Sequence, residues 1–131
     1  MKKTLLSLLI LIFSINMYSQ GLGLTQKEIR KQRDGQKYIN DTTSMGYNYT
    51  EYKCTDGYVC IATTYVFDEN NEVTLVMDLF DLQHLPETMK YLNNKAIYTS
   101  SFTWIDEKES HLVELKLNSE HKQFIVIYTR L

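Results

Sequence analysis

The residues that could do chemistry in this chain of 131 residues are three histidines, two cysteines and two clusters of acids. The histidines are His84, His111 and His121, and none lies at a short metal-ligand spacing from another histidine or from a cysteine. We therefore expect all three at the surface, and the sequence indicates no metal site.

The two acid clusters, at residues 68–69 and 106–109, each interrupt an apolar segment. Two carboxylates can act as general acid and general base, but solvated turns explain these positions. The chain also has no glycine-rich phosphate loop and no Gly-x-Ser-x-Gly motif. We therefore expect a protein that is not an enzyme and that uses no cofactor.

The two cysteines, Cys54 and Cys60, leave two alternatives open. In an oxidising compartment they would form a disulfide across a short loop, which stabilises a fold by about 2 kcal/mol. A five-residue loop would place them opposite each other on a hairpin. The other alternative is two free thiols. Catalysis by a cysteine and a histidine would require such a free, activated thiol.

Aromatic side chains are the remaining candidates for binding, because the chain has ten tyrosines, five phenylalanines and one tryptophan. Many of them fall on one face of the expected strands, and we select Tyr49, Tyr98 and Trp104 as candidate binding residues. Packing in the core beneath a helix is the competing explanation. The full set is Tyr47, Tyr49, Tyr65, Phe67, Tyr98, Phe102, Trp104 and Tyr128.

Residues 1–19 have the pattern of a secretory signal peptide: Lys2 and Lys3, then an apolar run, then Ser19 before the expected cleavage site. The run is too short to span a bilayer of ~30 Å. This leader resembles those of secreted proteins of Bacteroidota-type bacteria. We therefore expect an exported protein, periplasmic or extracellular, with residues 20–131 forming a single small domain.

The charge of the mature chain argues against two classes of partner. The leader holds two lysines and no acid, so twelve basic and sixteen acidic residues remain, a formal charge of −4. This balance is unfavourable for nucleic acid and for anionic lipid. No later apolar run is long enough to span a membrane. A protein or a small ligand of the envelope is the expected partner, and the oligomeric state stays open.

A first helix is expected after Leu24. Thr25 is a suitable N-cap, Glu28 completes a capping box, and Ile29 can pack against Leu24. Residues 23–29, Gly-Leu-Thr-x-x-x-Ile, resemble the opening of BamE/SmpA-type outer-membrane assembly domains. The chain departs from that family because it has no lipid-anchoring cysteine, no second amphipathic helix directly after the first and no Gly-x-Pro corner. The resemblance implies a role in envelope assembly.

A long hairpin over residues 58–80 is the expected centre of the fold, with its turn at residues 68–71. We expect its bulky apolar side chains on one face and smaller ones on the other, with both faces at least partly covered. The bulky set is Val59, Ile61, Tyr65, Phe67, Val73, Leu75, Met77 and Leu79. The smaller set, where another molecule could dock, includes Cys60, Ala62, Thr64, Val66 and Val76.

A second helix should begin near Pro86, with Leu85, Met89 and Leu92 as its apolar stripe. Three strands should follow, at residues 96–105, 110–117 and 122–129, the last covered on both sides. The hairpin of the first two resembles the central hairpin in sequence, without proving a duplication.

The expected fold class is α+β, with an antiparallel sheet of about five to six strands and two helices in the order α-β-β-β-α-β-β-β. Three functions are compatible with this sequence. The first is a non-enzymatic binding or interaction module of the periplasm or cell envelope. The alternatives are a small periplasmic enzyme with an unrecognised site and an envelope assembly component.

Overall fold

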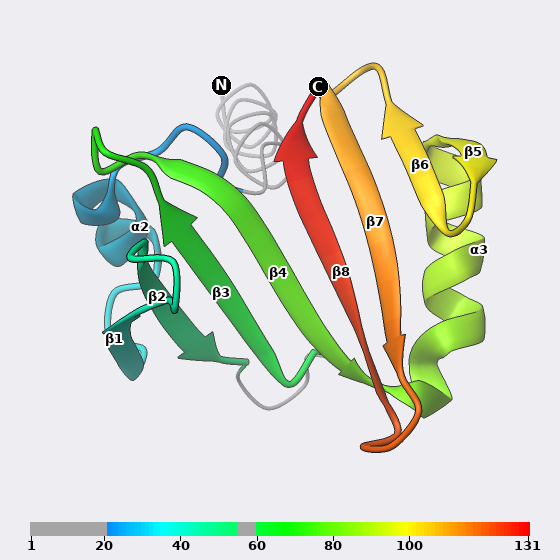
Figure 1. Ribbon diagram of the computed structural model, residues 1–131, viewed down its shortest axis with the longest axis horizontal. Helices are drawn as coiled ribbons and strands as arrows, with labels where there is room; N and C mark the ends of the chain where they lie inside the picture. Colours follow the sequence, from blue (N-terminus) through cyan, green and yellow to red (C-terminus); the bar gives the residue numbers. More distant parts are fainter. Residues whose placement is uncertain (1–20, 55–59) are drawn as a thin grey trace, which may run out of the picture.

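The computed structural model describes residues 21–54 and 60–131, which form one antiparallel sheet with two helices on the same side (Figure 1). The eight strands lie in the order β1-β2-β3-β4-β8-β7-β6-β5. The prediction of an α+β fold with two helices and an antiparallel sheet is confirmed. The predicted strand number and element order were wrong.

The sheet consists of two halves that meet along β4 and β8. The first half contains helix α2 (Gln26–Gln32) and strands β1 (Tyr38–Thr42), β2 (Asn48–Lys53), β3 (Ala62–Phe67) and β4 (Val73–Asp81). The second half contains the short 3-10 helix η1 (Leu82–His84), helix α3 (Leu85–Lys95) and strands β5 (Ile97–Ser100), β6 (Thr103–Asp106), β7 (His111–Asn118) and β8 (Gln123–Arg130). Each half is thus a helical segment followed by a four-stranded meander.

Helix α2 begins as the sequence predicts. The Thr25 hydroxyl accepts a hydrogen bond from the Glu28 amide, and the Glu28 carboxylate accepts one from the Thr25 amide. Ile29 is its buried residue, so the helix meets the sheet along one narrow line. At its end, Arg33 Nε donates to the Tyr65 hydroxyl at 2.9 Å. The guanidinium of Arg33 also stacks 5.1 Å from the ring centroid of Tyr52.

Helix α3 covers the other half of the same sheet face. Pro86 lies in its first turn, where the missing amide hydrogen costs nothing. Leu92 is buried against the core. Trp104 of β6 is fully buried and donates from Nε1 to the Asn93 side chain at 2.8 Å. The helix ends at Lys95.

The turn of the central hairpin is confirmed. The Asp68 carboxylate accepts hydrogen bonds from the amides of Asn70 and Glu72, and Asn71 adopts a positive φ of 60°. The turn therefore uses the local hydrogen bonding that Asp and Asn side chains favour.

The predicted faces of this hairpin were wrong. Tyr65 pairs with Val76, and a register shift near the turn places Val73 opposite Phe67 and Leu75 opposite Val66. Because directly paired residues point to the same face, Tyr65 and Phe67 share their face with Val73 and Val76. Thr64 and Val66 share theirs with Leu75, Met77 and Leu79. A single extra residue in one strand changed the pairing that alternation alone predicted.

The strand predicted at residues 96–105 is a hairpin. Ser101 and Phe102 both have positive φ, 49° and 59°, and they reverse the chain between β5 and β6. Two consecutive residues of this kind form the turn that matches the twist of antiparallel strands. Neither residue is glycine or asparagine, which is why the sequence did not reveal the turn.

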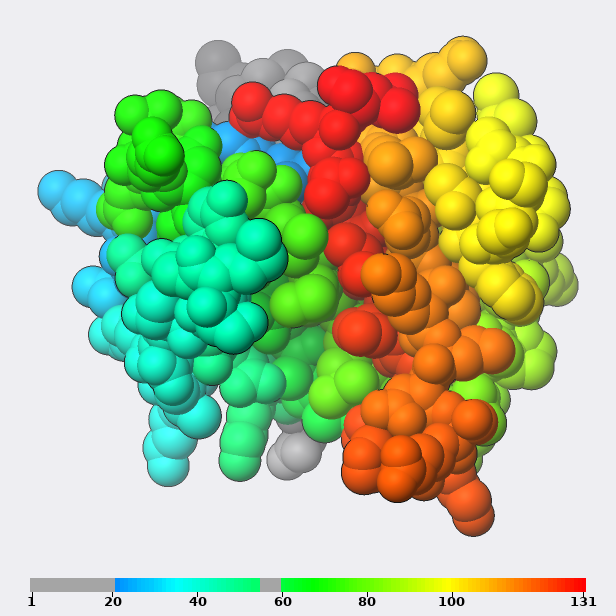
Figure 2. Space-filling model, in the orientation of Figure 1, coloured from blue at the N-terminus to red at the C-terminus, as the bar shows by residue number. Residues whose placement is uncertain are grey.

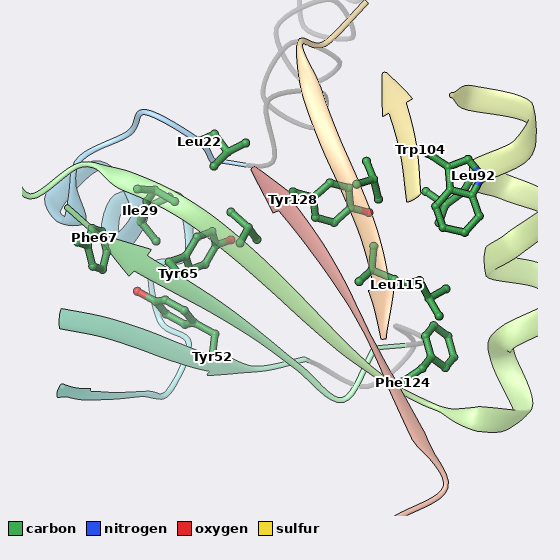
Figure 3. Close-up of a cluster of buried hydrophobic side chains, with 14 residues drawn as sticks. Leu22, Ile29, Tyr52, Tyr65, Phe67, Leu92, Trp104, Leu115, Phe124 and Tyr128 are labelled. Carbon is green, nitrogen blue, oxygen red and sulfur yellow. The ribbon is translucent and has the colours of Figure 1, made fainter. Parts of the chain in front are cut away.

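The core is a single cluster on the helix side of the sheet (Figure 3). Its strand residues include Tyr52, Tyr65, Trp104, Phe124 and Tyr128. Strand β8 is central, as predicted, but its buried residues alternate with partly exposed ones. It is therefore covered on one side, and the prediction that it is covered on both was wrong.

Cys54 and Cys60 form a disulfide with a Cα–Cα distance of 5.8 Å. The bridge closes the loop between β2 and β3, and the Cys54 amide also donates to the Ile61 carbonyl at 3.0 Å. The disulfide prediction is confirmed. Val59, one of the predicted bulky residues, and the expected signal peptide lie outside the described residues.

Candidate functional site

The structure does not bring the three candidate binding residues together. Trp104 is buried under α3, and Tyr98 packs edge-on against it at a centroid distance of 5.4 Å while remaining half exposed. Tyr49 lies on the opposite face of the sheet, since it pairs with Val66 rather than with a core residue. Most of the other aromatic candidates, among them Tyr65, Phe67 and Tyr128, belong to the core.

The more notable feature is the sheet face opposite the helices, which we call the open face. Both helices contact side chains of the core side: Gln26 donates to Thr50, Arg33 to Tyr65, and Asn93 accepts from Trp104. None of the apolar residues on the open face belongs to the core cluster. Figure 2 views the molecule from the open face, with the strands in front and the helices behind them.

The registers place the side chains of the open face in rows that cross several strands. Two rows matter here, and in each of them charged residues on β2 and β7 flank the apolar side chains of β4 and β8. Between β2 and β7 the first row runs Glu51, Thr64, Met77, Ile127, Glu114, and it continues to Ile39 on β1 and to Thr103 on β6. The second runs Lys53, Ala62, Leu79, Ile125, Lys116. The middle of the face is therefore apolar, and its sides carry one acid and one lysine each.

The apolar middle continues beyond these rows. A third row contains Tyr49, Val66, Leu75, Thr129, Leu112, Ile105 and Ile97 in register across seven strands. Most of these side chains are partly exposed, and Ile97 at the edge is 58% exposed. A contiguous apolar surface of this extent is typical of a contact site for another molecule.

A second candidate is a pocket of about 280 Å³ where β7 begins and β8 ends, which we call the His111 pocket. Its lining combines an acid, an imidazole and a guanidinium with two leucines: Leu22, Glu109, Ser110, His111, Arg130 and Leu131. Gly23, with a φ of 83°, lies against the Arg130 guanidinium, which would have to move to admit a larger side chain there. The chain before α2 is held beside this pocket, because the Gly23 amide donates to the Val73 carbonyl at 2.8 Å.

His111 is only 3% exposed, so its predicted place at the surface was wrong. Its Nδ1 atom is buried without a hydrogen-bond partner among the described residues. Burial lowers the pKa of His111, and the neighbouring charge of Lys95 lowers it further, while Asp106 and Glu109 oppose the shift. The imidazole is therefore held in its neutral form near neutral pH.

Asp106 was also expected in a solvated turn, and this was wrong. It is 3% exposed, accepts a hydrogen bond from the Glu109 amide and lies 3.6 Å from the Lys95 ammonium. It pairs directly with His111 across β6 and β7. In the sequence, Asp106 and His111 lie on either side of a short turn. Nothing in that spacing predicts that either side chain is buried.

The described residues contain no group of three or more His, Cys, Asp or Glu side chains that could hold a metal ion. Within residues 21–54 and 60–131, neither helix has the length and apolar character needed to cross a membrane.

Comparison of this chain with protein families, with curated proteins and with solved structures found no match. The candidate sites are therefore assigned from the geometry of this chain alone.

Proposed function

We propose that this chain is an exported, non-enzymatic interaction module that binds a protein through its open face. The observation that carries the proposal is the continuous apolar middle of that face, which no described helix covers. Met77, Leu79, Ile125 and Ile127 form its centre on the two central strands. Their side chains are partly exposed, so contact with a partner would remove apolar surface from water.

The distribution of charge on the open face also supports this function. Protein interfaces commonly combine an apolar centre with a polar rim. Glu51 and Lys53 on β2 and Glu114 and Lys116 on β7 form such a rim on both sides of the apolar side chains of β4 and β8. A disulfide suits an oxidising compartment outside the cytoplasm, and the leader predicts export to one.

The test uses a photo-reactive amino acid at Met77, in the middle of the open face, in cells that export the chain. The control carries it at Tyr91, which is 54% exposed on α3. We expect a protein adduct from position 77 and none from position 91. The partner is then purified, and its affinity for the wild type is compared with that for Met77→Asp. Equal affinities, or adducts from both positions, would contradict the proposal.

The second candidate function is a small-ligand or enzymatic site at the His111 pocket. It is favoured by the buried imidazole, whose Nδ1 lacks a partner among the described residues, beside Arg130 in the same lining. The test is an NMR titration with a panel of small carboxylates and inorganic phosphate. The exposed His121 is the internal control. Shifts of the His111 ring alone would support the pocket, and equal shifts of both rings would exclude it.

A further inference from the structure

The rim of the open face has a self-complementary charge pattern. On β2, Glu51 lies in the first row and Lys53 in the second; on β7, Glu114 lies in the first row and Lys116 in the second. The same order of acid and lysine therefore occurs on both sides of the apolar middle. None of these four side chains forms an ion pair or a side-chain hydrogen bond with another described residue.

We propose that the open face binds the open face of a second copy of this chain. This inference rests on the proposed function, because it names the partner of that same surface. The second copy is turned over about a twofold axis that runs across the strands, midway between the two rows. The first row of one copy then faces the second row of the other.

This arrangement pairs every charge on the rim with its opposite. Glu51 faces Lys53 of the second copy, and Glu114 faces Lys116 of the second copy. By symmetry, four such contacts form. Packed sheets lie ~10 Å apart, a gap that a glutamate and a lysine can bridge together. In the middle, Met77 lies over Leu79 of the second copy, and Ile127 lies over Ile125 of the second copy.

The other twofold arrangement is unfavourable. An axis parallel to the strands that runs along β4, midway between β2 and β7, would place Glu51 opposite Glu114 and Lys53 opposite Lys116 of the second copy. Four contacts between like charges would result, and such contacts oppose association. Of these two orientations, the charges therefore favour the one in which the first row faces the second row.

The axis lies midway between the first and second rows, so the contact extends to the third row on one side and to the row of Asp81 and Gln123 on the other. Eight strands about 4.8 Å apart span about 38 Å, and four rows spaced by two residues span about 27 Å, an area of about 1,000 Å². The first and second rows supply about half of this area, and stable interfaces bury about 800 Å² on each partner. Two aligned sheets also pack with their strands within about 30° of each other, which keeps the rows facing.

The experiment measures the dimer dissociation constant of the exported, purified chain by sedimentation velocity. We expect the wild type to dimerise at micromolar concentrations. Glu114→Lys should raise the dissociation constant about tenfold, because it creates two contacts between lysines. Lys116→Glu should have a similar effect. A wild type that stays monomeric over the whole concentration range would overturn the inference.

The double variant E114K/K116E restores opposite charges across the interface and should return the dissociation constant close to that of the wild type. Recovery of dimerisation in the double variant would show that the single variants lose charge pairing between the two copies and do not damage the fold. The matched control is Glu87→Lys, an exposed acid on α3 away from the open face, which should leave dimerisation unchanged. A tighter dimer for Glu114→Lys would instead indicate the axis parallel to the strands and overturn the proposed orientation.

The same measurements distinguish this inference from the proposed function. If the purified chain is monomeric but the photo-reactive residue at position 77 captures a different protein, the second copy is excluded and the interaction module stands. If the chain is monomeric and position 77 captures nothing, both fail.

Discussion

Two buried titratable side chains, His111 and Asp78, give the fold opposite dependences on pH. Burial lowers the pKa of His111 and raises that of Asp78. Asp78 lies on the core side of β4 and accepts a hydrogen bond from the Thr63 hydroxyl at 2.7 Å, which only partly offsets the cost of burying its charge. In each case, folding stabilises the neutral form of the side chain relative to its charged form.

For His111, protonation favours the unfolded chain, because the folded-state pKa is lower than the usual 6.5. Its contribution to stability is present above that value and is lost as the pH falls through the lowered pKa. We expect His111→Phe, which keeps a ring against Tyr128, to lose less stability than the wild type between about pH 7.5 and about pH 5. Urea unfolding at both pH values measures this, with His121→Asn as the control. Parallel losses in all three proteins would contradict it.

For Asp78, the folded-state pKa is higher than the usual 3.8. Its contribution is therefore complete below that value and is lost as the pH rises through the raised pKa. Asp78→Asn should be more stable than the wild type at neutral pH and should lose this advantage in acid. The exposed Asp81 on the same strand provides the control, Asp81→Asn. A variant that is equally or less stable at neutral pH would show that the Asp78 charge carries no cost.

At the scale of elements, the contact between α3 and β6 fixes the second half of the fold. Trp104 fills the space under the helix, and its indole N–H is bonded to Asn93. Tyr98 touches the same indole from the edge strand but is 52% exposed. The two aromatic residues are neighbours with very different burial.

We expect Trp104→Ala to lower the free energy of unfolding by about 3–5 kcal/mol. Tyr98→Ala should lower it by less than about 1 kcal/mol, because most of its surface already contacts water. Urea titrations of both variants measure the difference. Similar losses for the two variants would mean that α3 does not depend on the buried indole.

The elements that the sequence predicted well have local chemical signals. The capping box of α2, Pro86 at the start of α3 and the Asp68 turn each depend on residues only a few positions apart. The elements that it missed depend on tertiary pairing. No sequence motif indicates the extra residue after Val73 or the turn at Ser101 and Phe102. His111 is buried because segments distant in the sequence pack around it.

At the scale of the whole molecule, the two halves have the same order of elements and meet at the centre of the sheet. The sequence similarity between hairpins matched residues of β3–β4 with those of β6–β7. In the fold, the counterpart of β3–β4 is β7–β8, because each is the last hairpin of its meander. The sequence similarity therefore does not follow the equivalence of the halves.

The open face follows from this architecture. Both helices lie on one side of the sheet, and the side chains of each central strand point alternately to the two sides. Among the described residues, no helix covers the side chains that point to the other side. The sequence predicted the docking surface on the smaller face of the hairpin; Ala62, Thr64 and Val66 of that set lie on the open face, whereas Val76 belongs to the core. This difference depends on the pairing of β3 with β4, which places Met77 and Leu79 on the open side.

The joint between β4 and β8 has a consequence for how the chain folds. Every other pair in the sheet joins strands that are consecutive in the chain, whereas this one joins residues 42 to 54 positions apart, from Asp81 with Gln123 to Leu75 with Thr129. Bringing distant residues together costs more chain entropy and slows folding. Each meander can form from local contacts, and we expect their joining to be the slow kinetic step.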